Sequence, residues 1–311
     1  KWTANGRQSG DRSSVTTTQR ETNKKISNAK DKYLSDLGKK ICDPTTGHKC
    51  FWTAFNRLLN KKNNTNIPPL IENNKYISCF KEKASIFNNY FAIQCRPLEN
   101  PSTLPPFNSL TNVHLSDIPF DPAKIVDIIH KLNSKKANGF DGISIAMLKL
   151  CPNEVALPLS LIFKKCLEDG VFPSNWKKAN VQPVHKKNSR QSKSNYRPIS
   201  LLPICSKIFE KVIFDCMYSF FSENNLLTKH QSGFRPGDST INQLLSITTE
   251  IFDAFENLDE TRAVFLDISK AFDKVWHEGL CFKLRQNGIN GNLLNLVTNF
   301  LKNREQRVVL N

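Results

Sequence analysis

Hydrophobic residues in this chain follow two different spacings. They recur every three to four positions over residues 50–62, 80–90, 122–132, 157–169, 204–225, 241–259 and 292–304, which predicts amphipathic helices. Strand-like runs occupy 180–203, where two strands flank a polar loop, and also 262–268 and 305–311. A short extended piece with an Asn-Asn turn precedes the helix at 80–90. The order predicts an α+β fold in which helices outnumber strands.

Local signals set several boundaries. Asp121 followed by Pro122 predicts the start of a helix, and Gly170 predicts the end of the next long one. The two glycines of "KANGFDGIS" permit positive φ in a turn. Residues 1–40 are polar and predict a flexible linker or a frayed helix, whereas residues 41–110 predict a helical N-terminal extension that ends in a proline-rich connector. Residues 111–311 form the remaining predicted domain.

Charge and cysteine content narrow the class of protein. The net charge is +16, and residues 177–211 concentrate nine Lys/Arg against the one acid Glu210. Such a block indicates binding to a polyanion, most commonly nucleic acid, although a solvated basic face explains it as well. The nine cysteines are odd in number and scattered, as in an intracellular protein. No apolar run approaches the roughly 20 residues of a membrane-spanning helix, so we expect no membrane partner.

The stretch "AVFLDISKAFDKVWHEGL" (263–280) places an acid, Asp267, near the end of a continuous apolar run. The run predicts a central strand buried on both faces. A carboxylate there must emerge at the end of the strand or be neutralised by a cation such as a hard divalent metal. The alternative is that Asp267 caps the following helix, which is the better explanation of this stretch taken alone.

Several motifs resemble the reverse transcriptases of non-LTR (LINE-type) retrotransposons. "NYRPISLLPICSKIFEKVI", "HQSGFRPGDSTINQLL" and "AVFLDISKAFDKVWHEGL" are similar to three ordered motifs of that family, and "LNSKKANGFDGIS" to its upstream segment. "FLKNREQRVVLN" and two segments between residues 50 and 95 also resemble such elements. The resemblance implies the fingers and part of the palm of a right-hand polymerase, preceded by the helical extension.

The resemblance also implies residue roles around the third motif. Asp267 would bind both Mg²⁺ ions of a two-metal nucleotidyl transfer, with a further contact from the carbonyl of Ile268. The backbone amides near Lys270 and Ala271 would meet the triphosphate at a turn entering a helix. Phe272 matches the aromatic residue that selects dNTP over rNTP, but its spacing fits a core aromatic equally well.

The basic hairpin would supply cations to the incoming nucleotide. Lys187 or Lys186, together with Arg197, occupy the matching positions. Arg235 would line the template path, and Gln231, Gly233 and Phe234 would hold the template base, although a structural role for that loop fits equally well. The partners implied are an RNA template, a DNA primer and dNTP.

The later Asp-Asp motif of the family is absent from the sequence, as is an endonuclease that the full-length element would carry upstream. We therefore expect a C-terminally truncated fragment without polymerase activity of its own, because one carboxylate does not hold two Mg²⁺ ions. Two alternatives stay open: a non-catalytic RNA-binding relic, and a group II intron maturase-like reverse transcriptase. We expect the protein in nuclear and cytoplasmic ribonucleoprotein.

Overall fold

The computed structural model describes residues 9–59, 67–95 and 103–310, with backbone alone for 9–16 and 49. The chain forms two compact units, Lys1–Asn66 and Ile67–Asn311. Their division therefore falls inside the segment 41–110 that the sequence analysis treated as one extension.

Over its described residues, the first unit forms two helices, α1 (Ser9–Cys42) and α2 (His48–Leu58). Residues 9–40 are helical, as in the helical alternative predicted for 1–40; residues 1–8 lie outside the described part. The segment contains no proline and many residues that favour helix, so its polar composition is compatible with an exposed helix. Leu37 and Ala54 are buried where α1 and α2 pack together.

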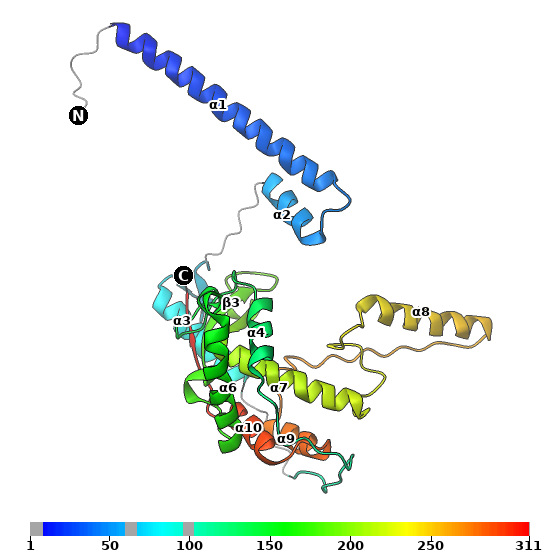
Figure 1. The fold of residues 1–311 in the computed structure, drawn as a ribbon. Coiled ribbons are helices and arrows are strands. Elements are labelled where there is room, and N and C mark those ends of the chain that lie inside the picture. The colour runs from blue at the N-terminus through cyan, green and yellow to red at the C-terminus, as the bar shows by residue number, and fades with distance from the viewer. Residues whose placement is uncertain (1–8, 60–66, 96–102, 311) are drawn as a thin grey trace. The chain divides into compact units, whose positions relative to one another are not determined.

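The second unit contains two small sheets (Figure 1). In the first, β1 (Leu70–Glu72) pairs antiparallel with β2 (Lys75–Ile77) through the predicted Asn73-Asn74 turn, and both asparagines have positive φ. In the second, β3 (Lys178–His185) lies between antiparallel β4 (Tyr196–Leu201) and parallel β5 (Glu305–Val308). The predicted basic hairpin and the predicted last strand are confirmed.

Helix α3 (Phe80–Gln94) packs on this three-stranded sheet. Phe87 and Phe91 of α3 are fully buried against Val181 and Tyr196 of the hairpin. The Phe87 and Tyr196 rings meet edge to face, with centroids 4.9 Å apart. This small core joins the segment before residue 96 to the hairpin.

A larger core lies among the helices. It unites α4 (Pro122–Lys131), α5 (Ile145–Leu150), α6 (Pro152–Asp169), α7 (Ile204–Glu223) and α10 (Gly291–Leu301), and α9 (His277–Gln286) packs on α10. Phe209 of α7 lies in its aromatic centre. Its ring centroid is 4.6 to 5.9 Å from those of four aromatic neighbours: Phe120, Phe163, Phe172 and Trp176.

The predicted helix boundaries follow from local capping. The Asp121 carboxylate accepts a hydrogen bond from the Ala123 amide at 2.9 Å, with Pro122 in the first helical turn. Gly170 ends α6 in the left-handed conformation with φ +63°. Ser239 caps α8 (Thr240–Glu256) by accepting from the Asn242 amide at 3.2 Å. These boundaries are confirmed.

The two glycines of the turn at 136–144 have different roles. Gly142 has φ +76°, as predicted. Gly139 instead lies against the backbone before α7, where an added Cβ would stand 2.5 Å from the Pro203 nitrogen. Backbone atoms do not move away as a flexible side chain does, so this position accommodates only glycine.

We predict that Gly139→Ala lowers the free energy of unfolding by roughly 1–3 kcal/mol through this overpacking. Urea denaturation followed by circular dichroism measures the change. Gly233→Ala is the matched control, because a Cβ there meets no atom within 4 Å. Equal stability of both variants and the wild type would contradict the close packing of Gly139.

The segment around Asp267 differs most from expectation. Residues 259–268 run without secondary structure, and Val264, Phe265 and Leu266 are 82 to 92% exposed. The predicted buried strand is therefore wrong in this structure. A strand needs a neighbour for its backbone hydrogen bonds, and among the described residues no strand pairs with this segment.

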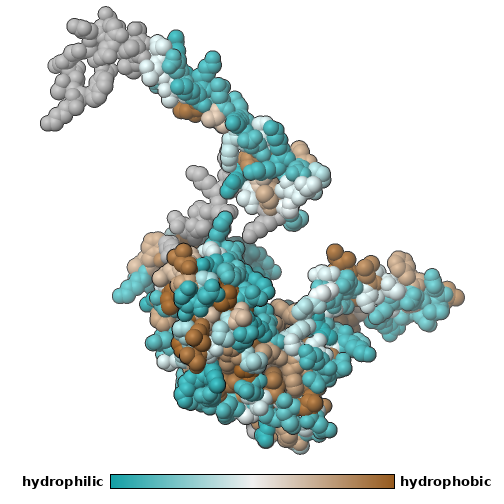
Figure 2. All heavy atoms as spheres, viewed as in Figure 1, coloured by the Kyte–Doolittle hydropathy of each residue, from teal (hydrophilic) through white to brown (hydrophobic). Residues whose placement is uncertain are grey.

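Helix α8 shares this exposure and buries none of its residues. It stands apart from the other helices of its unit, and hydrophobic side chains gather along it (Figures 1 and 2). Its amphipathic pattern is correct, but nothing in the described part of the chain covers its apolar face. That face is made by Ile241, Leu244, Leu245, Phe252 and Phe255.

Candidate nucleotide and nucleic-acid interface

The β3–β4 hairpin presents the predicted cations to solvent. Lys186, Lys187 and Arg197 are all exposed, and Arg197 lies opposite Val184 in the antiparallel register. The connecting loop is ordered by its own hydrogen bonds: the Lys186 amide donates to the Asn195 carbonyl at 2.8 Å, and the Tyr196 hydroxyl donates to the Arg190 carbonyl at 2.7 Å. The positive side chains thus extend from a defined loop.

Lys177, counted in the same basic block, is not on that surface. It is buried, and its ammonium donates to the Asn299 side-chain oxygen at 2.7 Å. Burial lowers the pKa of Lys177, and the positive charge of Arg304 lowers it further. Lys177 therefore belongs to the interior and not to the nucleic-acid face, which the sequence spacing did not reveal.

The turn after Asp267 is exposed. Neither Asp267 nor Ile268 forms a hydrogen bond or an ion pair with another described residue. The capping role considered for Asp267 is therefore not observed either. Lys270 has φ +56°, and its carbonyl accepts hydrogen bonds from the amides of Asp273 and Lys274. The helix expected to begin at Lys270 and Ala271 is wrong: a turn occupies 269–274, and α9 begins at His277.

The structure brings Phe272 next to the glycine-containing loop that follows α7. The rings of Phe272 and Phe234 meet edge to face at 5.7 Å, and both side chains are mostly exposed, Phe272 by 78%. Phe272 is therefore not a core aromatic here. Two motifs separated along the chain are neighbours at this contact.

The loop that carries Phe234 is held by Arg235. Its guanidinium donates to the carbonyls of Thr228 and Gln231 at 3.2 and 3.3 Å, and the Gln231 amide donates to the Gly233 carbonyl at 3.1 Å. Arg235 thus closes the loop on itself. This geometry matches the structural role for the loop that the sequence left open.

Tyr90 of α3, which belongs to none of the predicted sites, connects the hairpin with the turn after Asp267. The ammonium of Lys270 lies 5.1 Å from the centroid of its ring, and that of Lys193 lies 5.8 Å away. Lys193 opens the short η2 turn (Lys193–Asn195) and pairs with Glu72. No local pattern signals Tyr90, because its partners are distant in sequence.

The described residues do not make a two-metal site. Among them, no group of three or more His, Cys, Asp or Glu side chains is placed to hold a metal ion. Hard divalent ions take six or more oxygen ligands, and Asp267 alone offers one carboxylate.

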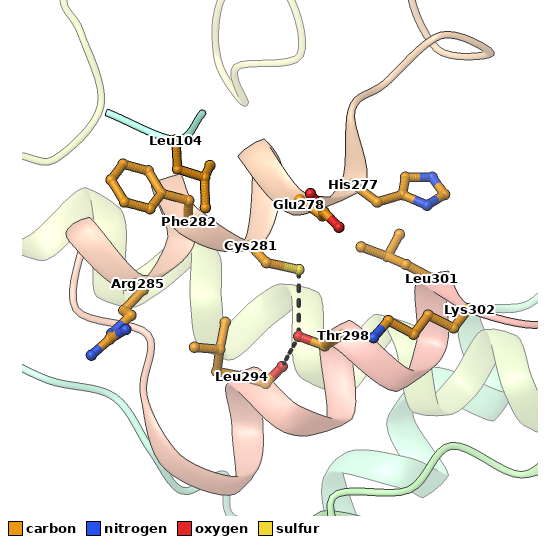
Figure 3. A pocket seen from close by; sticks show the side chains of 10 residues that line it. All are labelled: Leu104, His277, Glu278, Cys281, Phe282, Arg285, Leu294, Thr298, Leu301 and Lys302. Carbon is orange, nitrogen blue, oxygen red and sulfur yellow. Dashed lines mark hydrogen bonds between the residues drawn. The ribbon is translucent and has the colours of Figure 1, made fainter. Parts of the chain in front are cut away.

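A separate hollow of about 280 Å³ lies between α9 and α10 (Figure 3). The Thr298 hydroxyl faces the Cys281 sulfur at 3.4 Å and bonds to the Leu294 carbonyl at 2.8 Å. Leu104 of the connector closes one side. None of the residues that line the hollow belongs to the predicted sites.

Residues 184–310 match the family described as reverse transcriptase (RNA-dependent DNA polymerase). The match covers the loop and the second strand of the hairpin, the Phe234 loop, the Asp267 turn and β5, so residues 184–310 form a reverse transcriptase domain. Reverse transcriptases generally use a divalent metal, usually Mg²⁺. No helix among the described residues combines the length and the apolar character needed to cross a membrane.

Proteins of non-LTR retrotransposons are similar to the chain over a longer stretch. It is 31% identical to the probable RNA-directed DNA polymerase from transposon X-element of Drosophila melanogaster, over 76% of this chain and 26% of that protein. This chain is 33% identical to the probable RNA-directed DNA polymerase from transposon BS of the same organism, over 66% of this chain and 24% of that protein. The RNA-directed DNA polymerase from mobile element jockey of Drosophila melanogaster is 35% identical over 52% of this chain and 18% of that protein.

These relatives and the family match support a LINE-type reverse transcriptase. The chain spans about a quarter of the length of the first two relatives. The alignments with X-element and BS are longer than the 184–310 match, so similarity to those two relatives extends beyond the reverse transcriptase domain.

Proposed function

We propose that this chain forms the nucleotide- and template-binding part of an RNA-directed DNA polymerase of a non-LTR retrotransposon. The observation that carries the proposal is the convergence of three motifs: the exposed basic hairpin, the Phe234 loop and the turn after Asp267. Phe234 touches Phe272, and Tyr90 links Lys193 to Lys270. Residues far apart in sequence thus lie next to one another at these contacts.

On this proposal the hairpin corresponds to the fingers and the Asp267 segment to the palm. Lys186, Lys187 and Arg197 bind phosphate oxygens of the incoming dNTP, and Phe272 lies beside its ribose. Phe234 contacts the template. An RNA–DNA hybrid is recognised by its backbone and shape, which requires cations more than base-reading side chains.

Asp267 would contribute one carboxylate to the Mg²⁺ site, with the other ligands outside the residues described. Its exposure leaves it accessible for that purpose. We expect no incorporation of dTTP on poly(rA)/oligo(dT) by the 311-residue chain alone, since a single carboxylate does not hold two ions in productive geometry. A primer-extension assay checks this, and robust incorporation would contradict it.

Binding to the hybrid tests the proposed function without requiring catalysis. We expect the chain to bind labelled poly(rA)/oligo(dT), with log K falling linearly as log[salt] rises. Fluorescence anisotropy at several salt concentrations measures the slope. Absence of binding at low salt would refute the proposal.

A non-catalytic RNA-binding module is the second candidate, favoured because Asp267 is the one carboxylate predicted for the metal site. The two candidates differ in their response to Mg²⁺ with dTTP. The polymerase predicts that dTTP and Mg²⁺ strengthen retention of the hybrid, because the nucleotide bridges protein and template. The module predicts a salt-dependent affinity that dTTP leaves unchanged.

A further inference from the structure

Residues 67–95 precede the matched reverse transcriptase residues yet contact the proposed nucleotide-binding face. We call this segment, which comprises β1, β2 and α3, the upstream brace. Its contacts fall on two regions: the loop of the basic hairpin, and the turn that follows Asp267.

The β1 strand fixes the hairpin loop. The Ile71 amide donates to the Gln191 carbonyl at 2.9 Å, and the Glu72 carboxylate pairs with the Lys193 ammonium. Both charged side chains are about one-third exposed, so the pair is partly shielded from water. A backbone hydrogen bond and an ion pair on adjacent residues define both the position and the orientation of the loop.

Helix α3 anchors the base of the same loop. Phe87 is buried against Tyr196, the first residue of β4, and the Tyr196 hydroxyl reaches back to the Arg190 carbonyl. The loop is therefore held from the helix side as well as from the strand side. Movement of the hairpin cations relative to α3 would break these contacts.

Tyr90 extends the brace to the second region. Its ring faces the ammonium groups of Lys193 and Lys270, which repel each other as like charges. The negative face of an aromatic ring attracts a cation, at roughly 0.5–1 kcal/mol for an exposed pair. Glu72 neutralises part of the charge of Lys193. The ring thereby holds two cations from different motifs beside the same side chain before any phosphate arrives.

We propose that Tyr90 is a positioning residue that preorganises Lys193 and Lys270 to receive the triphosphate of a nucleotide. The inference rests on the proposed function and adds to it the role of a segment outside the matched residues. Preorganisation strengthens binding because the ordering of the two side chains is already complete in the free protein.

The first test needs no ligand. Brief acetylation of the chain, followed by mass spectrometry of Lys193 and Lys270, reports how strongly the Tyr90 ring protects each amine from the reagent. We expect Tyr90→Ala to raise the acetylation rate of Lys270 about 2- to 5-fold, the factor that corresponds to the cation–π energy. Tyr90→Phe keeps the ring and should match the wild type.

Tyr76→Ala is the matched control, because Tyr76 lies in the same segment, is exposed, and makes no ring contact among the described residues. Thermal unfolding by circular dichroism shows whether each variant is folded. If Lys270 is acetylated equally fast in Tyr90→Ala and the wild type, with both folded, the Tyr90 ring does not hold the Lys270 ammonium and the inference is overturned.

The second test measures affinity for dTTP in Mg²⁺ buffer and, separately, for poly(rA)/oligo(dT). We expect Tyr90→Ala to weaken dTTP binding about 2- to 5-fold and Tyr90→Phe to restore it. A loss confined to the hybrid would assign the two cations to nucleic-acid phosphates and overturn the inference. If the wild type binds hybrid and dTTP but Tyr90→Ala equals it, the inference fails and the proposed function stands. If the wild type binds neither, both fail.

Discussion

Replacement of Phe209 by alanine should lower the free energy of unfolding of the second unit by about 3–5 kcal/mol, the usual cost of removing a buried aromatic side chain. Phe209 is fully buried, and its ring contacts Phe163 and Phe172 in stacked geometry. The cavity left behind is surrounded by rigid rings and cannot close without displacing them. Urea denaturation measures the change.

Phe214→Ala provides the matched control for Phe209→Ala, because it removes the same side chain from the same helix. Phe214 is 52% exposed and stacks on Tyr218. We expect a loss well below that of Phe209→Ala, since little area leaves water at this position. Similar losses for both variants would show that Phe209 is not the centre of the core.

The second large effect concerns the basic hairpin. Simultaneous replacement of Lys186, Lys187 and Arg197 by glutamine should weaken binding of poly(rA)/oligo(dT) by about a hundred-fold at 0.1 M salt. Each phosphate contact contributes about 0.9 to the slope of log K against log[salt], so three contacts reduce the slope by about 2.7. Anisotropy titrations at four salt concentrations give both quantities.

A control with the same change in net charge replaces Lys131, Lys164 and Lys165. These lysines are exposed on α4 and α6, away from the hairpin in sequence. If binding depended on net charge alone, both triple variants would lose affinity equally. That result would refute a specific role for the hairpin, whereas a loss limited to the hairpin variant supports it.

Much of the fold was predictable because its signals are local. The Asp121-Pro122 cap, the Asn73-Asn74 turn and the left-handed Gly170 each act within a few residues, and all three lie where the sequence placed them. The hairpin at 178–201 was predicted for the same reason, from two short runs around a polar loop. Such features do not depend on distant parts of the chain.

The prediction of a buried strand at 262–268 failed for a complementary reason. Its continuous apolar run satisfies the pattern of a central strand, but a strand is stable only beside a partner. No described strand pairs with it. The apolar face of α8 is exposed for the same lack of a neighbour. Hydrophobic patterning thus gives the preference of a segment, and tertiary neighbours decide whether that preference is satisfied.

The candidate site likewise contains some residues that local motifs predict and others that only the structure brings together. Asp267, the hairpin cations and Phe234 were identified from motifs contained in short stretches of sequence. The burial of Lys177, the contact of Phe234 with Phe272 and the position of Tyr90 between Lys193 and Lys270 emerged only from the structure.

The sequence by itself determined the class of protein, the helices with their caps and the basic hairpin, because capping, turn chemistry and motif spacing act over a few residues. Tertiary structure alone decided which cations face solvent, whether the Asp267 segment forms a strand, and how residues 67–95 hold the hairpin loop. Those outcomes depend on contacts between residues far apart in the chain, and no local pattern encodes which of them will meet.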